Sequence, residues 1–123
     1  MAFIKTRSSA LLNGVTVDAE ETSNNSTSTD LSQATACAVE VSCTFAAGAT
    51  CGATVYVYAS GNNSAFDTGP YDAFDIPVSA GNTVRYTFPI IPSPKYIKMA
   101  VENLDPVTAI SNVYVYTQIQ EVS

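Results

Sequence analysis

Alternation of apolar and polar residues is the feature that most constrains this chain. Residues 37–45 have cysteine, valine or phenylalanine at every odd position, and alanine, glutamate, serine or threonine at every even one. Residues 51–59 alternate in the same way, with tyrosine, threonine and glycine at the even positions. A period of two is typical of strands that bury one face. Because no segment shows a helical period, the chain is predicted to be all-β.

The same rhythm returns in the C-terminal half, over residues 83–90, 96–102 and 113–120. Pro89 interrupts the first of these segments, which predicts an edge strand or a bend there. Turn-forming residues separate the segments at intervals of about 8–12 residues. With 123 residues in all, we expect an antiparallel β-sandwich or jelly roll of about seven or eight strands.

Three regions are expected along the chain. Residues 1–20 form an N-terminal arm or an edge hairpin, because Asn13-Gly14 is a two-residue turn signal. Residues 21–35 are polar and of low complexity, and they predict a loop that acts as a hinge. Residues 36–123 form the sandwich domain. The arm either folds back on its own sheet or reaches a neighbouring subunit, with these candidate contacts: Phe3, Ile4, Leu11 and Leu12.

Composition excludes several classes of function. The net charge is −6, and the five basic residues form no run, so direct binding to nucleic acid is not expected. The chain contains no histidine, which excludes nucleophile systems that pair serine or cysteine with histidine. No apolar run is long enough for a signal peptide or a membrane span, so we expect neither a secretory route nor a membrane partner.

The three cysteines, Cys37, Cys43 and Cys51, all fall on the apolar phase of their segments. One interpretation is that they are small buried thiols that pack as hydrophobic residues. The other is a Cys43–Cys51 disulfide. If residues 37–45 and 49–59 pair as a hairpin around residues 46–48, these two cysteines face each other across it.

Two identical tetrapeptides place pairs of tyrosines opposite pairs of valines. They are Val-Tyr-Val-Tyr at residues 55–58 and at residues 113–116. If the two strands share a sheet, the tyrosines form one aromatic platform that could contact protein or sugar. The alternative is that they are cross-strand filler. The candidate contact residues are Tyr56, Tyr58, Tyr114 and Tyr116.

Carboxylates offer weak candidates for a metal or for catalysis. Asp67, Asp72 and Asp75 lie in a loop whose oxygens could hold calcium, but their spacing matches no known calcium loop and aspartate is common in turns. Asp72 with Asp75, or Glu102 with Asp105, could be cast as a catalytic pair. Solvated loop carboxylates are far commoner, so we expect no cofactor, no metal and no enzymatic activity.

An ordered series of short motifs carries a resemblance to a known group of proteins. Asp30-Leu31-Ser32 comes first, followed by residues 53–63 (ATVYVYASGNN), residues 94–98 (PKYIK) and a final Val-x-Val strand. Over about residues 30–119 the chain resembles the small β-sandwich structural proteins of tailed bacteriophage virions. Several of these carry a Gly-Ala-Thr-Val strand, a Gly-Ser-Asn-Asp-Gly loop and a Pro-x-Tyr-Ile-Arg strand. Here residues 59–63 (ASGNN) replace the loop, and Lys98 replaces the arginine.

The resemblance implies a virion component of the capsid decoration or cement type. Such a protein binds the major capsid protein on the outer shell and stabilises contacts between its subunits. Copies of the chain are expected to associate, as a trimer, after synthesis in the host cytoplasm. Two alternatives remain open: a carbohydrate-binding sandwich on a tail or fibre, and an accessory protein of the tail or baseplate.

Overall fold

A computed structural model describes residues 2–122, which contain nine strands and no helix. No helix long and apolar enough to cross a membrane occurs in that range. The strands are β1 (Phe3–Arg7), β2 (Leu12–Val17), β3 (Thr29–Asp30), β4 (Ala34–Phe45), β5 (Ala53–Ser60), β6 (Asp72–Ile76), β7 (Thr83–Ile90), β8 (Tyr96–Asn103) and β9 (Ile110–Val122).

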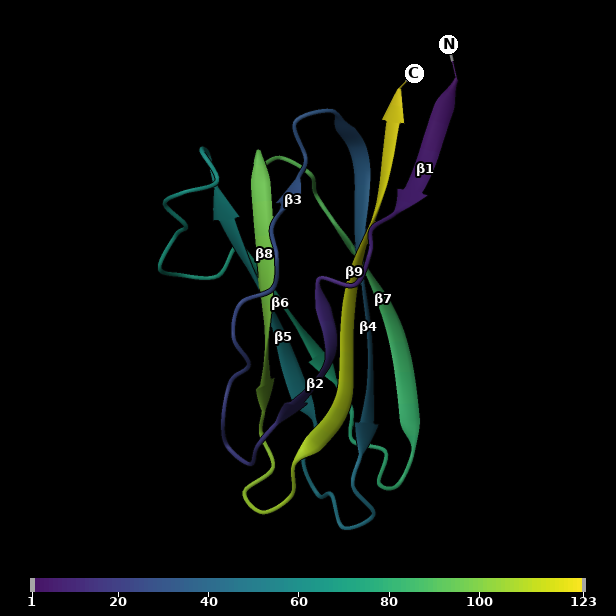
Figure 1. Cartoon of the computed structure of the whole chain (residues 1–123), viewed down its shortest axis with the longest axis vertical. Helices are drawn as coiled ribbons and strands as arrows, with labels where there is room; N and C mark the ends of the chain where they lie inside the picture. Colours follow the sequence, from purple (N-terminus) through teal and green to yellow (C-terminus); the bar gives the residue numbers. More distant parts are fainter. Residues whose placement is uncertain (1, 123) are drawn as a thin grey trace.

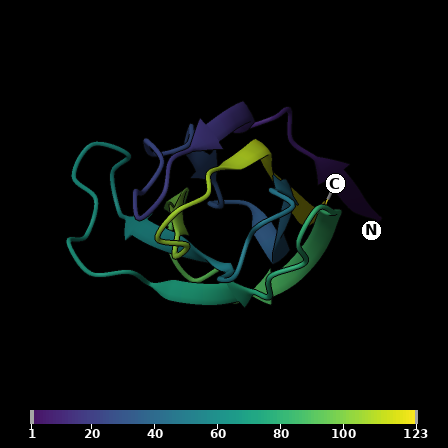
Figure 2. The ribbon, with the colours of Figure 1, turned by 90° about the horizontal axis from the view of Figure 1, so that it is seen from below.

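The strands form two antiparallel sheets that face each other (Figure 1). Sheet A has the order β1-β9-β4-β7, and β2 also pairs with β9, beside a different part of that strand than β1. Sheet B has the order β3-β8-β5-β6. Viewed along the strands, the sheets enclose a core, and the loop between β5 and β6 projects to one side (Figure 2). The predicted all-β sandwich is therefore confirmed.

The core consists of the inward side chains of β4, β5, β8 and β9. The alternation predicted for residues 37–45, 51–59, 96–102 and 113–119 places these side chains correctly, because the pleat sends every second residue inward. The apolar residues with 0 % of their surface exposed are Val39, Val41, Cys43, Val55, Val57, Ile97, Met99, Val101, Val113 and Val115.

Aromatic rings close one open side of the sandwich, between edge strands β6 and β7. Phe74 of β6 stacks on Phe88 of β7, with ring centroids 4.5 Å apart and planes 9° apart. The ring centroid of Tyr86, also on β7, lies 6.0 Å from that of Phe88. As predicted, the strand that contains Pro89 is an edge strand. This strand, β7, pairs with β4.

The hairpin expected between residues 37–45 and 49–59 is wrong. Strand β4 pairs with β7 and β9, whereas β5 pairs with β6 and β8 in the other sheet. The connection over residues 46–52 therefore crosses from one sheet to the other. Each strand has a single apolar face, and that face is buried equally well when the two strands lie opposite each other across the core.

Residues 22–30, expected as part of a hinge, are hydrogen-bonded along β8. The Ser23 amide donates to the Val101 carbonyl at 2.8 Å, and the Ser23 hydroxyl accepts from the Val101 amide at 2.9 Å. Ser26 makes the same two bonds with Met99, at 2.7 and 2.8 Å. Serine hydroxyls thus stand in for backbone carbonyls and satisfy the edge of β8, which a polar segment can do without a regular strand.

The Asn13-Gly14 pair is a bulge inside β2 and not the predicted hairpin turn. The register of β2 on β9 shifts between Asn13 and Val15, and Gly14 has a φ of +65°. A side chain on Gly14 would meet the Tyr114 hydroxyl at 3.0 Å, so this position also makes room for the tyrosine. Both β1 and β2 pair with β9, and the N-terminal region lies on its own sheet.

A buried carboxylate joins the loops at one end of the sandwich. Asp105 is 1 % exposed. Its Oδ2 accepts hydrogen bonds from the Thr50 and Cys51 amides at 2.6 and 3.1 Å, and its Oδ1 accepts from the Val107 and Thr108 amides, both at 2.9 Å. These backbone bonds, those from Thr108 and Thr50 foremost, hold the pKa of the Asp105 carboxyl well below its usual range.

Asn103 extends the same cluster to the N-terminal region. It is 0 % exposed, and its Nδ2 donates to the carbonyls of Val17 and Thr108 at 3.1 and 2.8 Å. Its Oδ1 accepts from the Asp105 amide at 3.0 Å. Because every polar atom of this side chain has a partner, the end of β2 and the loop before β9 are held together without exposed backbone groups.

Truncation of Met99 to alanine tests the core. Met99→Ala is expected to lower the free energy of unfolding by about 2–5 kcal/mol, because a buried cavity replaces the side chain. Val107, 82 % exposed, is the control, and Val107→Ala should change stability by less than about 0.5 kcal/mol. Urea denaturation followed by circular dichroism measures both, and equal effects would contradict the core described above.

Replacement of Asp105 by asparagine tests the loop cluster. Because the folded pKa is lowered, the carboxylate stabilises the protein fully above its unfolded pKa of about 3.9, and this stabilisation is lost as the pH falls towards the folded pKa. Asp105→Asn should therefore lower the melting temperature at pH 7, and the difference from wild type should shrink below about pH 4. Asp67→Asn is the control, since the Asp67 carboxylate accepts no hydrogen bond from residues 2–122. A pH-independent difference would contradict the assignment.

Candidate functional site

The four candidate tyrosines do not form one platform. Tyr56 and Tyr58 lie on β5 in sheet B, whereas Tyr114 and Tyr116 lie on β9 in sheet A. In each pair the ring centroids are 6.4 Å apart. Since both pairs alternate with core valines, each pair lies on the outer side of its own sheet, and the sandwich separates them.

The sheet B tyrosines have partners within the chain. The Tyr56 hydroxyl donates to Glu102 Oε1 at 2.7 Å, and this bond raises the pKa of the tyrosine above its usual value. Beside Tyr58, the Lys98 ammonium lies 4.2 Å from the centre of the Phe66 ring. The side chains on the outer face of sheet B thus contact one another.

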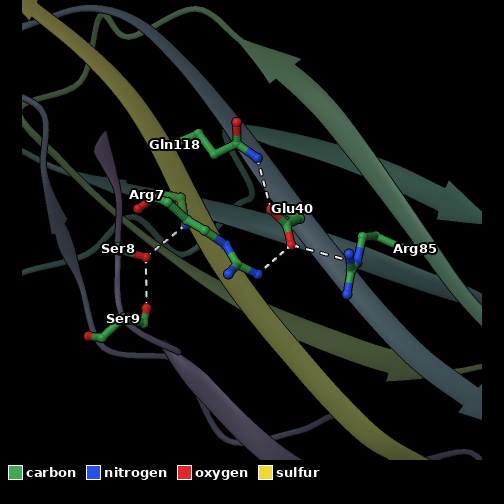
Figure 3. A network of polar contacts seen from close by, with 7 residues as sticks. Arg7, Ser8, Ser9, Glu40, Arg85 and Gln118 are labelled. Atoms are coloured by element: carbon green, nitrogen blue, oxygen red, sulfur yellow. Dashed lines mark hydrogen bonds and ion pairs between the residues drawn. The ribbon is translucent and has the colours of Figure 1, made fainter. Parts of the chain in front are cut away.

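On the outer face of sheet A, a buried glutamate gathers partners from three other strands (Figure 3). The side chain of Glu40, on β4, is 7 % exposed. Its Oε2 lies 2.6 Å from Nη2 of Arg7 on β1 and 3.8 Å from Nε of Arg85 on β7. Its Oε1 accepts a hydrogen bond from Nε2 of Gln118 on β9 at 2.8 Å. Burial raises the pKa of Glu40, but the hydrogen bonds from Arg7 and Gln118 and the two guanidinium charges outweigh it, so the pKa lies below its usual value.

Arg7 also connects this network to the sheet A tyrosines. Its guanidinium carbon lies 3.6 Å above the centre of the Tyr116 ring, which is a cation–π contact. The Tyr116 and Tyr114 rings are nearly parallel, with 9° between their planes. The guanidinium and the two rings therefore form a ladder along β9.

Beside this ladder lies a shallow hollow of about 500 Å³, which we call the sheet A groove. It lies over β4, between the tyrosines of β9 and Arg85 of β7. It exists because the outward residues of β4 at this end are small, while Arg85 on β7 and the tyrosines on β9 are long. Its lining includes Ser42, Thr44, Arg85, Asn112, Tyr114 and Tyr116.

The candidate arm contacts divide into two groups. Phe3 and Ile4, on β1, are 61 % and 50 % exposed. Leu12 is 6 % exposed and belongs to the core, and Leu11 packs partly buried against it. Only Phe3 and Ile4 are therefore placed to contact another molecule. Figure 1 shows β1 and the end of β9 projecting beyond the rest of the sandwich.

The aspartates considered for calcium do not come together. Among residues 2–122 no three carboxylate, cysteine or histidine side chains gather in a way that could hold a metal ion. Asp72 accepts from the following amide, and Asp75 accepts from the Thr54 hydroxyl at 3.3 Å. Of the carboxylate pairs considered for catalysis, Glu102 binds Tyr56, and Asp105 is enclosed by loop amides.

All three cysteines are free thiols in the structure. Cys37 and Cys43 are buried, and burial raises the pKa of each thiol to about 11. Cys51 is half-buried at the start of sheet B. The register that would place Cys43 opposite Cys51 does not occur, because β4 and β5 lie in different sheets.

Sequence reasoning missed Glu40 and its partners. The signal was a lone carboxylate among small outward residues of a strand that is otherwise apolar. A charge in the middle of such a strand needs cations on neighbouring strands. Which cations those are depends on strand pairing, and Arg7 and Arg85 are 33 and 45 residues from Glu40 in the sequence.

Removal of Arg7 tests the network around Glu40. Arg7→Ala leaves a buried carboxylate with fewer partners, so we expect the free energy of unfolding to fall by about 1–3 kcal/mol. Lys5→Ala is the matched control, because Lys5 lies on the same strand and face but forms no ion pair with residues 2–122. Urea denaturation compares the two, and an equal loss in both variants would show that Glu40 does not depend on Arg7.

Comparisons with known proteins show the fold. No family model matches the chain, and no curated protein matches it. Among solved structures, it is similar to the protein of Bacillus endospore appendages, described as disulfide-linked pili, with a TM-score of 0.51 and 12 % identity over 98 % of this chain and 89 % of that one.

Two further structures cover nearly all of this chain but only part of their own. The PBSX exported protein XepA has a TM-score of 0.56 and 17 % identity, over 96 % of this chain and 37 % of that chain. A chain of infectious bursal disease virus strain Gx has a TM-score of 0.53 and 16 % identity, over 97 % and 32 %. The chain thus spans about a third of these two proteins and shares a β-sandwich with them.

Proposed function

We propose that this chain is a structural protein of a bacteriophage particle, which binds the outer surface of the capsid and stabilises contacts between major capsid subunits. The observation that carries the proposal is strand β1. All five of its residues are exposed, two of them, Phe3 and Ile4, are large and apolar, and the strand lies at the edge of sheet A. An edge strand that exposes large apolar side chains favours association.

The chemistry of β1 suits the addition of a strand from a neighbouring subunit. In the described chain β1 pairs only with β9, so its other backbone edge is open. Phe3 lies opposite Val122, which is 42 % exposed, so apolar surface continues onto β9. A partner strand would satisfy the open edge and bury Phe3 and Ile4, each worth about 1.5–3 kcal/mol when fully buried.

A non-catalytic role agrees with the positions of the carboxylates. Asp75, Glu102 and Asp105 each accept hydrogen bonds that hold strands or loops in place. The fold likeness to a chain of infectious bursal disease virus also supports a place in a particle. We propose further that copies of the chain form a trimer, since closed rotational symmetry is usual for oligomers and lets several weak contacts act together.

Copy number tests the location in the particle. Quantitative mass spectrometry of gradient-purified particles should find this chain in near-stoichiometric ratio to the major capsid protein. A few copies per particle would instead indicate a tail, neck or baseplate protein, and so contradict the capsid role. Absence from particles would overturn the virion proposal as a whole.

A double variant tests β1 itself. Phe3→Ser with Ile4→Ser should reduce binding to undecorated capsids by roughly tenfold or more, because about 1.4 kcal/mol corresponds to a factor of ten. Val107→Ser is the control, since Val107 is exposed in the loop between β8 and β9, and Figure 1 shows this loop at the end of the sandwich opposite β1. Deletion of residues 1–20 would be less informative, because Leu12 and Val17 belong to the core. Full decoration by the double variant, with an unchanged circular dichroism spectrum, would rule out β1 as the contact.

A further inference from the structure

The sheet A groove contains polar groups that the protein leaves without partners. Ser42 is 8 % exposed and lines the groove, yet its hydroxyl makes no hydrogen bond to residues 2–122. The Asn112 amide and the Tyr114 and Tyr116 hydroxyls, on exposed or half-buried residues, likewise make no hydrogen bond to residues 2–122. These groups are accessible to solvent, since Thr108 Oγ1 is the only buried side-chain polar atom without a partner among residues 2–122. The groove therefore offers donors and acceptors to a ligand.

A bulge in β9 shapes the part of the groove that Asn112 lines. Ser42 pairs with Tyr114 and Thr44 pairs with Ser111, so Asn112 and Val113 together lie opposite the single residue Cys43. Asn112 has a φ of +51°, an uncommon conformation for a residue other than glycine. Bulges of this kind redirect a side chain at sites of function, and here the bulge adds the Asn112 amide to the lining.

The outer face of sheet A is also basic in a protein that is acidic overall. The net charge is −6, but three of the five basic residues, Lys5, Arg7 and Arg85, lie on this face together with the single carboxylate of Glu40. The side chain of Arg85 is 69 % exposed and lies 3.8 Å from Glu40, so most of its donors remain available. Lys5 borders a second hollow of about 230 Å³ further along β4, where Ala36 and Ala38 face outward. Positive charge therefore extends along the face beyond the groove itself.

We propose that the sheet A groove binds an acidic polysaccharide. Ser42, Asn112 and the tyrosine hydroxyls would bind sugar hydroxyls, the aromatic ladder would pack against the ring carbons, and Arg85 and Lys5 would pair with uronate carboxylates. The groove volume of about 500 Å³ is within the usual range for small-molecule sites. The hollow beside Lys5 would accept further units of the same chain. This inference concerns the outer face of sheet A, not the open backbone edge of β1, and does not rest on the proposed capsid role.

A hydroxyl-rich ligand fits this face better than a protein partner does. A protein surface that covered the groove would leave several of these polar groups desolvated unless each met a matching group, which is costly. A sugar chain carries a hydroxyl on most ring carbons and can satisfy them. Its carboxylates are opposite in sign to the charge on this face, whereas the acidic remainder of the molecule would repel them.

The test is calorimetric titration of the full chain with three acidic hexasaccharides, of galacturonate, guluronate and hyaluronan. We expect at least one to bind, and the fully methyl-esterified galacturonate hexamer to bind roughly tenfold more weakly than the free acid, a loss of about 1.4 kcal/mol. Raised ionic strength should weaken the interaction in part, because the carboxylate contacts are screened and the hydroxyl contacts are not. Failure of all three acidic hexamers to bind would overturn the proposal.

Variants locate the site. Arg85→Gln should weaken binding at least fivefold, and Ser42→Val, which fills the bottom of the groove, should abolish it. Lys98→Gln, the same change of charge on sheet B, should leave binding unchanged. The Phe3→Ser, Ile4→Ser variant should bind sugar normally, which separates this site from the capsid contact. Equal losses in Arg85→Gln and Lys98→Gln, or loss of capsid binding but not of sugar binding in Arg85→Gln, would show that the groove is not a sugar site.

Discussion

Packing of branched aliphatic side chains between the two sheets decides what each outer face can carry. Because a strand alternates its side chains, burial of Val39 and Val41 places Glu40 and Ser42 on the outer face. A shift of one residue in strand register would turn the apolar side chains outward and the polar ones inward. Burial of the core therefore fixes which residues lie on the outer faces. The sheet A groove is thus a consequence of core packing combined with the small residues that β4 places outward.

Glu40 on β4 links side chains of β1, β7 and β9 on the outer face of sheet A. A carboxylate that is nearly buried on the middle strand of a sheet requires cations, and β1 and β7 each supply one. Arg7 serves two purposes, since it binds Glu40 and lies on the Tyr116 ring. The N-terminal strand is therefore attached to sheet A by side-chain contacts as well as by its ladder with β9.

The two proposed surfaces are compatible with one another in space. Addition of a strand to β1 takes place at the edge of sheet A, in the plane of the sheet. The groove lies on the outer face, over β4. A single copy could therefore be attached to a particle through β1 and still present its basic, hydroxyl-lined face to the surroundings. Arg7, whose side chain is 47 % exposed, lies between the two surfaces.

The sequence by itself determined the all-β class, the inward residues of each long strand and the edge position of the strand with Pro89, because the pleat and the restrictions on proline act locally. It also identified the tyrosine pairs, but it grouped Phe3 and Ile4, which are exposed, with Leu11 and Leu12, which pack in or against the core. Only the tertiary structure decided that Tyr56 and Tyr114 lie on opposite faces, that Cys43 is remote from the pairing register of Cys51, and that Glu40 meets Arg7. A short loop after a strand with one apolar face suits a hairpin and a crossing between sheets equally well. The choice is made by contacts between segments far apart in the chain, such as β4 with β9, which no local pattern encodes.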